Sequence, residues 1–361
     1  MTNSMNNLLA KGKLVCPVCN GLLDMKVGLS CESCHQDFPM LGDIPILLGK
    51  PQEKIGTWHQ QFRNFLEMQQ NTIRQESSLV ASPACYEPQK KRLQKIIYAR
   101  TANLQAIADL MIPLRDAGSG MPPEKPEPAA AAAGRFSNAF YLLRDWGWDT
   151  GESDIMCDKV KEILPSNLDM ESLLVLGAGG CRESYTLHEH YNCPLTVSTD
   201  VDPFKLLGAS RIISGGELNL YQILLNNIRD AQDNVSYWEL RAPHPPENEF
   251  LYMLTDATRM PFAENSFHVV FTPFLIDAVG EDLRTLAPKI RHILQPGGIW
   301  VNYGAMTFRA EVAYTGEEVL AIVADSGFQV LNQGYEKKPH IAPRESGLQQ
   351  VFDCLHFTAM K

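Results

Sequence analysis

Glycines and acidic residues follow the apolar runs in the second half of the chain. Four consecutive apolar residues at 173–176 lead directly into the turn Gly177-Ala-Gly-Gly180. Such a run before a turn is typical of a buried parallel strand, and glycines let the backbone bend sharply and bring its N–H groups close to a ligand. The turn alone is compatible both with a nucleotide or cofactor site and with a simple connection from strand to helix.

A pair of acidic residues indicates which ligand the turn could bind. The segment 195–202 reads as a second strand and carries Asp200 and Asp202 at its end. A carboxylate at this place can accept hydrogen bonds from a ribose diol, and the sequence leaves open which of the two does so. Arg182 stands where a dinucleotide-binding turn has its third glycine, so a pyrophosphate site is disfavoured.

Two further apolar runs complete a series of four features. One ends at Asp256 and Ala257, and the next covers 267–271. Glycine turn, acid, Asp-Ala pair and strand, in this order, resemble the S-adenosylmethionine-dependent class I methyltransferases. The resemblance implies an α/β fold, a Rossmann-like domain with a mostly parallel sheet, and S-adenosylmethionine as the cofactor. The positions that would contact this cofactor are Gly177, Ala178, Gly179, Asp200 or Asp202, Asp256, Ala257 and Pro273.

Three further motifs resemble the carnosine N-methyltransferase family. They are Arg144-Asp-Trp146 before a helical run, Phe274-Leu-Ile-Asp277, and Pro296-Gly-Gly-Ile-Trp-Val-Asn-Tyr-Gly304. The resemblance covers about residues 140–359 and implies methylation of an imidazole nitrogen in a histidine-containing dipeptide. It also assigns Arg144 to the cofactor's carboxylate, a suitable partner for a planar guanidinium. The alternative is that Arg144 pairs with Asp145 on the surface.

Asp277 is the residue that we expect to be catalytic. Methyl transfer to a ring nitrogen requires the lone pair of that nitrogen to be held close to the methyl group while the ring is neutral. An aspartate that accepts the N–H of the opposite ring nitrogen fixes the tautomer and stabilises the cation that forms. The alternative is that Asp277 caps a helix starting near Glu281.

The positions expected to contact the methyl acceptor come from three parts of the chain. They are Phe274, Asn302, Tyr303, Arg309 and Phe352. Tyr303 could instead face the core, and Arg309 either binds a substrate carboxylate or lies on the surface. The family's aromatic–histidine motif is replaced here by Thr307-Phe-Arg309, and its tyrosines before the C-terminal Cys354 by Gln350-Val-Phe-Asp353. Because those positions line the family's substrate pocket, the resemblance specifies the cofactor better than the substrate.

Four of the nine cysteines form two Cys-x-x-Cys pairs separated by eleven residues. They are Cys16, Cys19, Cys31 and Cys34. Four thiolates can enclose zinc tetrahedrally without an open position, which is typical of a structural site, and 22–29 suits a short hairpin between the pairs. The alternatives are a ribbon that has lost its metal or a redox pair. The five other cysteines and the scattered histidines, among them His340, are interpreted as surface or core residues.

The stretch 38–48 resembles small zinc-ribbon proteins that bind and activate methyltransferases, so the ribbon is expected to contact a protein partner or its own catalytic domain. Residues 52–115 read as helical and include the basic cluster Lys90–Lys95, either a solvated face or a contact for an anionic partner. Residues 118–134 have the composition of a linker. The expected division is a zinc ribbon (1–50), a helical segment with linker (51–134) and a methyltransferase domain (135–361).

Composition restricts the class of protein. The 361 residues carry a net charge of −10, which disfavours a broad nucleic-acid interface. We find no apolar run long enough for a bilayer and no signal-peptide pattern, so the cytoplasm is the expected location. The sequence therefore predicts an S-adenosylmethionine-dependent N-methyltransferase that acts on a small imidazole compound. The alternatives are an RNA or protein methyltransferase, and a catalytically silent cofactor-binding scaffold.

Overall fold

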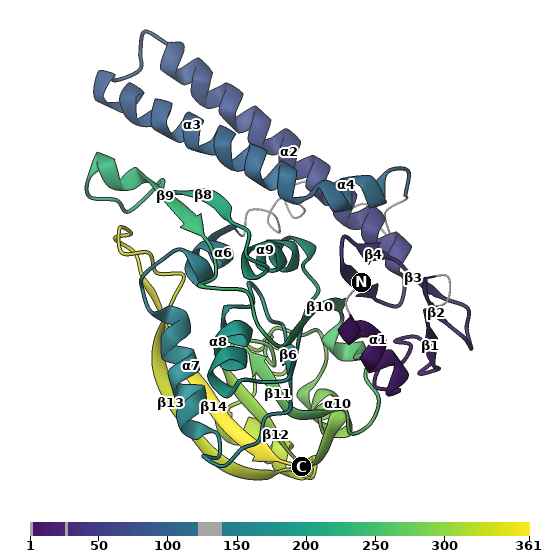
Figure 1. Cartoon of the computed structure of the whole chain (residues 1–361). Coiled ribbons are helices and arrows are strands. Elements are labelled where there is room, and N and C mark those ends of the chain that lie inside the picture. The colour runs from purple at the N-terminus through teal and green to yellow at the C-terminus, as the bar shows by residue number, and fades with distance from the viewer. Residues whose placement is uncertain (1–2, 26–27, 122–138) are drawn as a thin grey trace.

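The computed structural model describes residues 3–25, 28–121 and 139–361 (Figure 1). Most of the expected linker at 118–134 lies outside these residues. Within them, no helix combines the length and the apolar character needed to cross a membrane.

A nine-stranded sheet forms the centre of the structure, in the order β13-β14-β12-β11-β6-β7-β10-β5-β4. Five neighbouring strands are parallel: β6 (Ser172–Leu176), β7 (Leu195–Asp200), β10 (Glu249–Thr255), β11 (Phe267–Pro273) and β12 (Leu294–Gly304). In sequence order they are arranged 3-2-1-4-5, which is the doubly wound arrangement. Two long strands, β13 (Gln329–His340) and β14 (Gln350–Met360), continue the sheet in antiparallel fashion. The predicted Rossmann-like sheet is confirmed.

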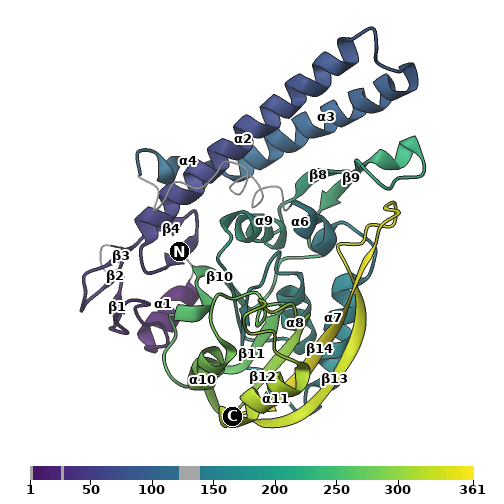
Figure 2. The ribbon, with the colours of Figure 1, turned by 180° about the vertical axis from the view of Figure 1, so that it is seen from behind.

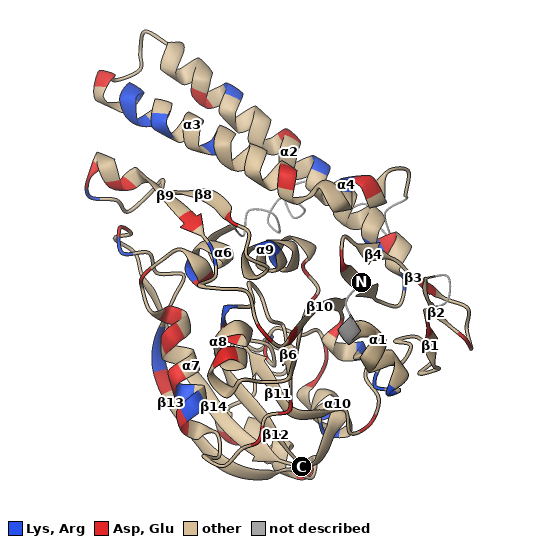
Figure 3. Ribbon diagram, viewed as in Figure 1, with Lys and Arg blue, Asp and Glu red and all other residues tan. Residues whose placement is uncertain are grey.

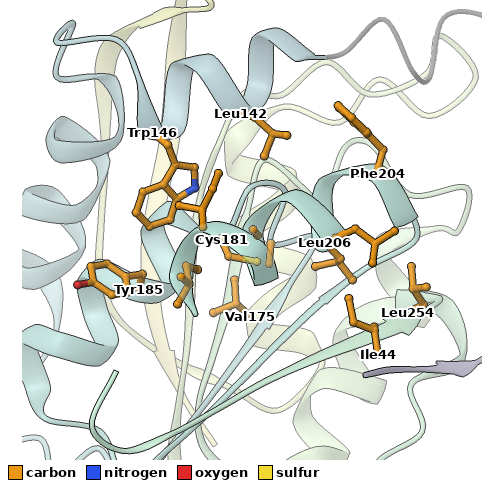
Figure 4. Packing of buried hydrophobic residues seen from close by; sticks show 14 of the residues in the cluster. Ile44, Leu142, Trp146, Val175, Cys181, Tyr185, Phe204, Leu206 and Leu254 are labelled. Atoms are coloured by element: carbon orange, nitrogen blue, oxygen red, sulfur yellow. The ribbon is translucent and has the colours of Figure 1, made fainter. Parts of the chain in front are cut away.

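The sheet is covered on both faces because its central strands are apolar throughout. All five residues of β6 are buried, and successive side chains point to opposite faces. Leu173 and Val175 belong to one buried cluster, and Leu174 and Leu176 to another. The first cluster includes residues of α6 (Ala139–Trp146), α7 (Glu152–Ile163), α8 (Arg182–Tyr191) and α9 (Pro203–Ile213), and part of it is drawn in Figure 4. The second includes α10 (Leu283–Ile293) and α11 (Gly316–Asp325).

The N-terminal segment is attached directly to this sheet. It contains α1 (Asn3–Ala10), β1 (Leu23–Asp24), β2 (Leu29–Cys31), β3 (Asp37–Phe38), β4 (Met40–Leu41) and β5 (Ile44–Leu47). Strand β5 runs parallel to β10, with Ile46 opposite Leu254 and Leu47 opposite Thr255. A second connection is the hydrogen bond from Val15 N to Pro261 O, at 3.0 Å. The predicted boundary at residue 50 stays a prediction, since β5 belongs to the ribbon sequence and to the main sheet.

A helical hairpin projects from the α/β body (Figure 2). It consists of α2 (Pro51–Ala81) and α3 (Glu87–Leu110), followed by α4 (Ile112–Gly118). Helix α3 contacts the two-stranded sheet of β8 (Leu218–Ile223) and β9 (Val235–Leu240), where Asn103 Nδ2 donates to Tyr221 O at 2.7 Å. The expected helical segment is confirmed, with a break at 82–86. The basic cluster Lys90–Lys95 lies on α3, where Figure 3 shows several Lys and Arg residues. Short 3₁₀ turns, η1 (Ala231–Asn234) and η2 (Ala257–Arg259), complete the elements.

Candidate active site

The strand order determines where a ligand site is expected. Strands β6 and β11 are neighbours, but their following connections lead in opposite directions along the sheet, and ligands of doubly wound sheets bind outside the carboxyl ends at this point. A cavity of about 300 Å³ lies there. Eight of the residues expected to contact cofactor or acceptor line it together: Arg144, Gly177, Ala178, Gly179, Pro273, Phe274, Asp277 and Phe352.

The glycine turn after β6 has the backbone geometry that its sequence requires. Gly177 and Gly179 have φ angles of +71° and +55°, a region that L side chains rarely adopt. A Cβ atom added to Gly179 would meet no atom within 4 Å, so the cavity is open directly above this residue. The Gly179 N–H donates to Asp200 Oδ2 at 2.9 Å, and the Gly180 N–H donates to Asp145 Oδ2 at 3.1 Å. The turn is therefore held in place by two carboxylates.

The acids at the ends of β7 and β10 bind the backbone, and none of them lines the cavity. Asp200 accepts hydrogen bonds from the N–H groups of Gly179 and Asp202. Asp202 caps α9, and burial raises the pKa of its carboxyl to about 6 although Lys205 acts in the opposite direction. Asp256 caps the turn η2 by accepting from Thr258 N at 2.8 Å, and Ala257 is buried in that turn. Their expected contacts with ribose and adenine stay predictions.

Arg144 and Asp145 form a buried ion pair beside the cavity. Arg144 Nη2 lies 2.6 Å from Asp145 Oδ1, and the exposed fractions of the two side chains are 8% and 0%. The alternative of a pair on the surface is wrong about the location, because α6 packs over the glycine turn here. Trp146 from the same helix donates its indole N–H to Gly180 O at 2.7 Å. Helix α6 thus fixes the turn through two consecutive side chains.

Asp277 lies in the segment after β11 with one carboxylate oxygen bound and one available. Its Oδ2 accepts hydrogen bonds from Thr307 N at 2.9 Å and from Thr307 Oγ1 at 2.5 Å. Its Oδ1 has no hydrogen-bond partner among the described residues. The alternative role as a helix cap is wrong, because α10 begins at Leu283 and is capped by Asp282, which accepts from Arg284 N. The residue is buried, with an exposed fraction of 9%, and lines the cavity.

An aromatic wall faces the same cavity. The ring centroid of His340 lies 5.3 Å from that of Phe274 and 5.0 Å from that of Phe352. Burial, together with the charges of Arg144 and Lys338, lowers the pKa of His340 to about 4, so its ring is neutral near pH 7. His340 Nδ1 is buried without a hydrogen-bond partner in the described part of the chain. Sequence reasoning missed this residue, since nothing near it on the chain marks it as part of a site.

Three residues expected to contact the acceptor do not line the cavity. Asn302 is buried between strands, where its Oδ1 accepts from Thr272 Oγ1 at 2.9 Å and its Nδ2 donates to Leu355 O at 3.3 Å. Tyr303 is fully buried and donates to Glu336 Oε2 at 3.0 Å, so the core-facing alternative describes it correctly. Arg309 lines a second hollow, which also includes Phe308 and Tyr314 and shares Asp277 with the cavity. The strand end was predicted correctly, and of the two alternatives given for Tyr303 the structure shows the core-facing one.

The four paired cysteines come together in the N-terminal segment. Their Sγ atoms all lie within 4.8 Å of one another, with 3.7 Å between those of Cys16 and Cys34 and 3.5 Å between those of Cys19 and Cys31. Strands β1 and β2 pair in antiparallel fashion between the two cysteine pairs, as the spacing predicted. Four thiol ligands from two turns could hold a zinc ion in a closed tetrahedral site.

A comparison with protein families decides between the methyltransferase classes. The model of the family described as "Carnosine N-methyltransferase" matches residues 142–361, which is more than half of the chain. The chain belongs to this family. A carnosine N-methyltransferase from Dictyostelium discoideum is 25% identical over 127 residues, which are 34% of this chain and 27% of the relative. The match thus spans about a quarter of that carnosine N-methyltransferase.

Solved structures similar to this member of the carnosine N-methyltransferase family include two methyltransferases. An S-adenosylmethionine-dependent methyltransferase from Mesorhizobium loti has 14% identity and a TM-score of 0.39, with 56% of this chain and 96% of the other covered. A methyltransferase described as putative, from Bacillus halodurans, has 13% identity and a TM-score of 0.39, with 57% and 97% covered.

Proposed function

We propose that this protein transfers a methyl group from S-adenosylmethionine to a ring nitrogen of a small imidazole compound, such as a histidine derivative or a carnosine-like dipeptide. Membership of the carnosine N-methyltransferase family supports the reaction class. The observation that carries the proposal is that Gly179 and Asp277, from the turns after two adjacent strands, line one cavity. A cofactor group and an acceptor group can therefore meet in it.

The residues around the glycine turn fit the cofactor. When bound, S-adenosylmethionine supplies a methyl group on a sulfonium centre, whose sulfur takes the bonding electrons as the methyl leaves. The open space above Gly179 allows close approach to the backbone, and Pro273 lies across the cavity at the end of β11. Because Asp145 and Asp200 hold the N–H groups of the turn, this geometry exists before a ligand binds. Preorganisation of this kind lowers the cost of binding.

In this proposal Asp277 orients the acceptor. Thr307 fixes Oδ2, so Oδ1 is the oxygen that can accept the N–H of an acceptor imidazole. With this hydrogen bond made, the opposite ring nitrogen presents its lone pair to the methyl group. Formation of the nitrogen–methyl bond leaves a positive charge on the ring. The carboxylate stabilises this charge and then removes it by accepting the ring proton, which passes on to solvent.

The aromatic wall favours a flat, neutral acceptor. Phe274, His340 and Phe352 provide apolar ring surfaces, and the neutral state of His340 avoids repulsion of the cation that the reaction creates. The wall also lies on the same side of the cavity as Lys338, whose Nζ is 5.4 Å from the Phe274 ring centroid. The proposed acceptor pocket thus includes one residue, His340, that lies outside the family motifs quoted above.

Transfer of a labelled methyl group tests the proposal. Wild-type protein and Asp277→Asn are incubated with labelled S-adenosylmethionine and, in parallel, with carnosine, free histidine, histidine-containing tripeptides, bulk RNA and a mixture of unmodified proteins. We expect label in at least one imidazole compound, with the methyl on a ring nitrogen by mass spectrometry, and little label with Asp277→Asn. Label in RNA or protein alone would contradict the acceptor class. Binding of S-adenosylmethionine without transfer to any acceptor would support the scaffold alternative.

We also propose that the four cysteines bind one structural zinc ion. The ribbon then stabilises the first part of the chain, and its strand β5 occupies the edge of β10 that a separate activator protein could otherwise use. A protein partner, if the ribbon has one, would bind a different face.

A further inference from the structure

Five charged side chains are buried together on one side of the cavity. They are Arg144 and Asp145 of α6, Glu152 of α7, Glu183 of α8 and Lys338 of β13. The exposed fraction is no more than 8% for any of these side chains or residues. Burial alone would lower the pKa of Arg144, but the neighbouring carboxylates of Asp145 and Glu183 raise it above its ordinary value. The five groups therefore form one electrostatic cluster.

Four of these five groups are paired with each other or with the backbone. Arg144 binds Asp145 at 2.6 Å, and Lys338 Nζ lies 3.8 Å from Glu152 Oε2. Glu152 also accepts hydrogen bonds from Ile341 N at 3.0 Å and from Ala342 N at 2.9 Å. Each cation thus has its own carboxylate partner, and the fifth group, Glu183, has none of its own.

Glu183 is the unpaired member of the cluster. Its exposed fraction is 3%, and its Oε1 is buried without a hydrogen-bond partner among the described residues. Among these five groups two cations face three carboxylates, so Glu183 shares the charges of Arg144 and Lys338 with Asp145 and Glu152. Lys205, the other cation that lines the cavity, lies 3.9 Å from its own partner, Asp202. A buried carboxylate oxygen without a hydrogen bond is unfavourable, so such a group in a cavity wall indicates a ligand that donates hydrogen bonds, as an ammonium group does.

The place of Glu183 in the fold indicates which cation this is. It is the second residue of α8, three residues after Gly180, and it lines the cavity together with Gly179 and Arg144. Resting on the proposed function, we propose that the Glu183 carboxylate binds the α-ammonium group of the cofactor's methionine portion. Arg144 lines the same part of the cavity and is suited to the carboxylate of that portion. A zwitterionic head group thus meets one group of each charge.

The proposal makes opposite predictions for stability and for affinity. Without ligand, Glu183→Gln removes a buried charge that has no ion-pair partner of its own, so the variant should be at least as stable as the wild type. With ligand, it removes the charged partner of the ammonium group, which should weaken binding about ten- to hundred-fold. A residue with a purely structural role would lose stability instead.

Calorimetric titration with three adenosine compounds tests the assignment. S-adenosylmethionine and S-adenosylhomocysteine both carry the ammonium group, whereas methylthioadenosine lacks the whole amino-acid portion. We expect Glu183→Gln to weaken binding of the first two about ten- to hundred-fold and to leave methylthioadenosine unchanged. Glu189→Gln, on the same helix but outside the cavity, is the matched control and should leave all three affinities unchanged. Melting temperatures of the ligand-free variants provide the stability comparison.

Three outcomes would overturn the assignment. Equal weakening of all three ligands together with lower stability would mean that Glu183 only supports the glycine turn. A loss confined to S-adenosylmethionine would place the carboxylate at the sulfonium instead. Unchanged cofactor affinities with a raised KM for an amine-bearing acceptor would place it at the acceptor. If the wild type binds none of the three compounds, the proposed function itself fails, and that result is distinct from these three.

Discussion

Gly179 and Gly297 have the same left-handed backbone conformation but different surroundings. Their φ angles are +55° and +75°, and a Cβ atom added to either would meet no atom within 4 Å. Gly179 lines the cavity, whereas Gly297 lies near the start of β12. That strand ends at Gly304, seven residues later and about 20 Å away at the usual rise per residue, and the next residue, Ala305, lines the cavity. Substitutions at these two glycines can therefore distinguish the cost of a left-handed backbone conformation from the effect of filling the cavity.

Alanine at either position should reduce stability by a similar amount. A non-glycine residue in the left-handed region costs about 1–2 kcal/mol, and no neighbouring atom adds a clash at either site. Only the methyl group of Gly179→Ala projects into the space that we assign to the cofactor. An extra methyl forced into a filled site costs about 1–3 kcal/mol, which corresponds to about 5- to 150-fold in affinity.

Urea unfolding and calorimetric titration with S-adenosylhomocysteine measure the two effects separately. We expect both variants to lose about 1–2 kcal/mol of unfolding free energy and only Gly179→Ala to bind the ligand more weakly. Equal weakening by Gly297→Ala would mean that strain, not occupied space, reduces affinity. Unchanged affinity in Gly179→Ala would show that the cofactor does not lie over this turn, and the reasoning from strand order would be refuted.

Four further substitutions test other parts of the structure. Asp277→Asn should lower turnover about 100-fold or more, and Thr307→Val, which removes one hydrogen bond to the same carboxylate, about tenfold, with cofactor affinity unchanged in both by calorimetry. Cys31→Ser should reduce bound zinc from about one ion per chain to nearly none by elemental analysis and lower the melting temperature; full zinc content in the variant would exclude the four-thiolate site. Burial lowers the pKa of His188 to about 4, so the neutral ring stabilises the fold above its unfolded pKa of about 6.5, and this stability is lost as pH falls from there towards 4. The fall in melting temperature between about pH 7.5 and about pH 5 should therefore be smaller in His188→Gln than in the wild type and in the exposed control His190→Gln, and identical falls would contradict the burial argument.

The sheet and the glycine turn could be predicted because their signals are local. An apolar run such as 173–176 can be buried on both faces only inside a covered parallel sheet, and a turn with two left-handed residues requires glycine. The cluster of four cysteines could be predicted as well, because two Cys-x-x-Cys pairs at this spacing are a known pattern of zinc ligands. In the structure their four sulfur atoms lie together. Each of these predictions depends on residues that are adjacent or nearly adjacent in the chain.

The direction of side chains at strand ends was not predictable in the same way. Asn302 and Tyr303 were correctly placed at the end of β12, but both are enclosed by neighbours on β11, β13 and β14, through Thr272, Glu336 and Leu355. Which face a residue occupies depends on register, and one residue of shift reverses it. Asp256 illustrates the same limit, because an acid at a strand end can cap the next turn as well as bind a ligand.

His340 and Glu183 could not be found from local patterns because distant elements give them their character. His340 lines the cavity, and its ring is neutral because burial and cations on α6 and β13 lower its pKa. Two aromatic rings pack against it, that of Phe274 just after β11 and that of Phe352 on β14. Glu183 reads in sequence as an ordinary acid in the first turn of a helix, where the helix dipole favours it. It becomes a buried carboxylate without an ion-pair partner of its own only because α6, α7 and β13 bring two complete ion pairs beside it.

Strand β10 connects the N-terminal segment with the central strands of the sheet. Strand β10 pairs with β7 along one edge and with β5 along the other, and it leads directly into Asp256. The pairing of Leu47 with Thr255 places the last residue of β5 opposite the residue before this acid. A sheet edge left open at β10 would expose backbone N–H and C=O groups next to the ligand site, and edge strands without cover are prone to fray or to pair with other chains. By covering this edge, β5 links the ribbon sequence to the strand that leads into Asp256, so a change in the ribbon can reach this acid through one pair of hydrogen-bonded strands.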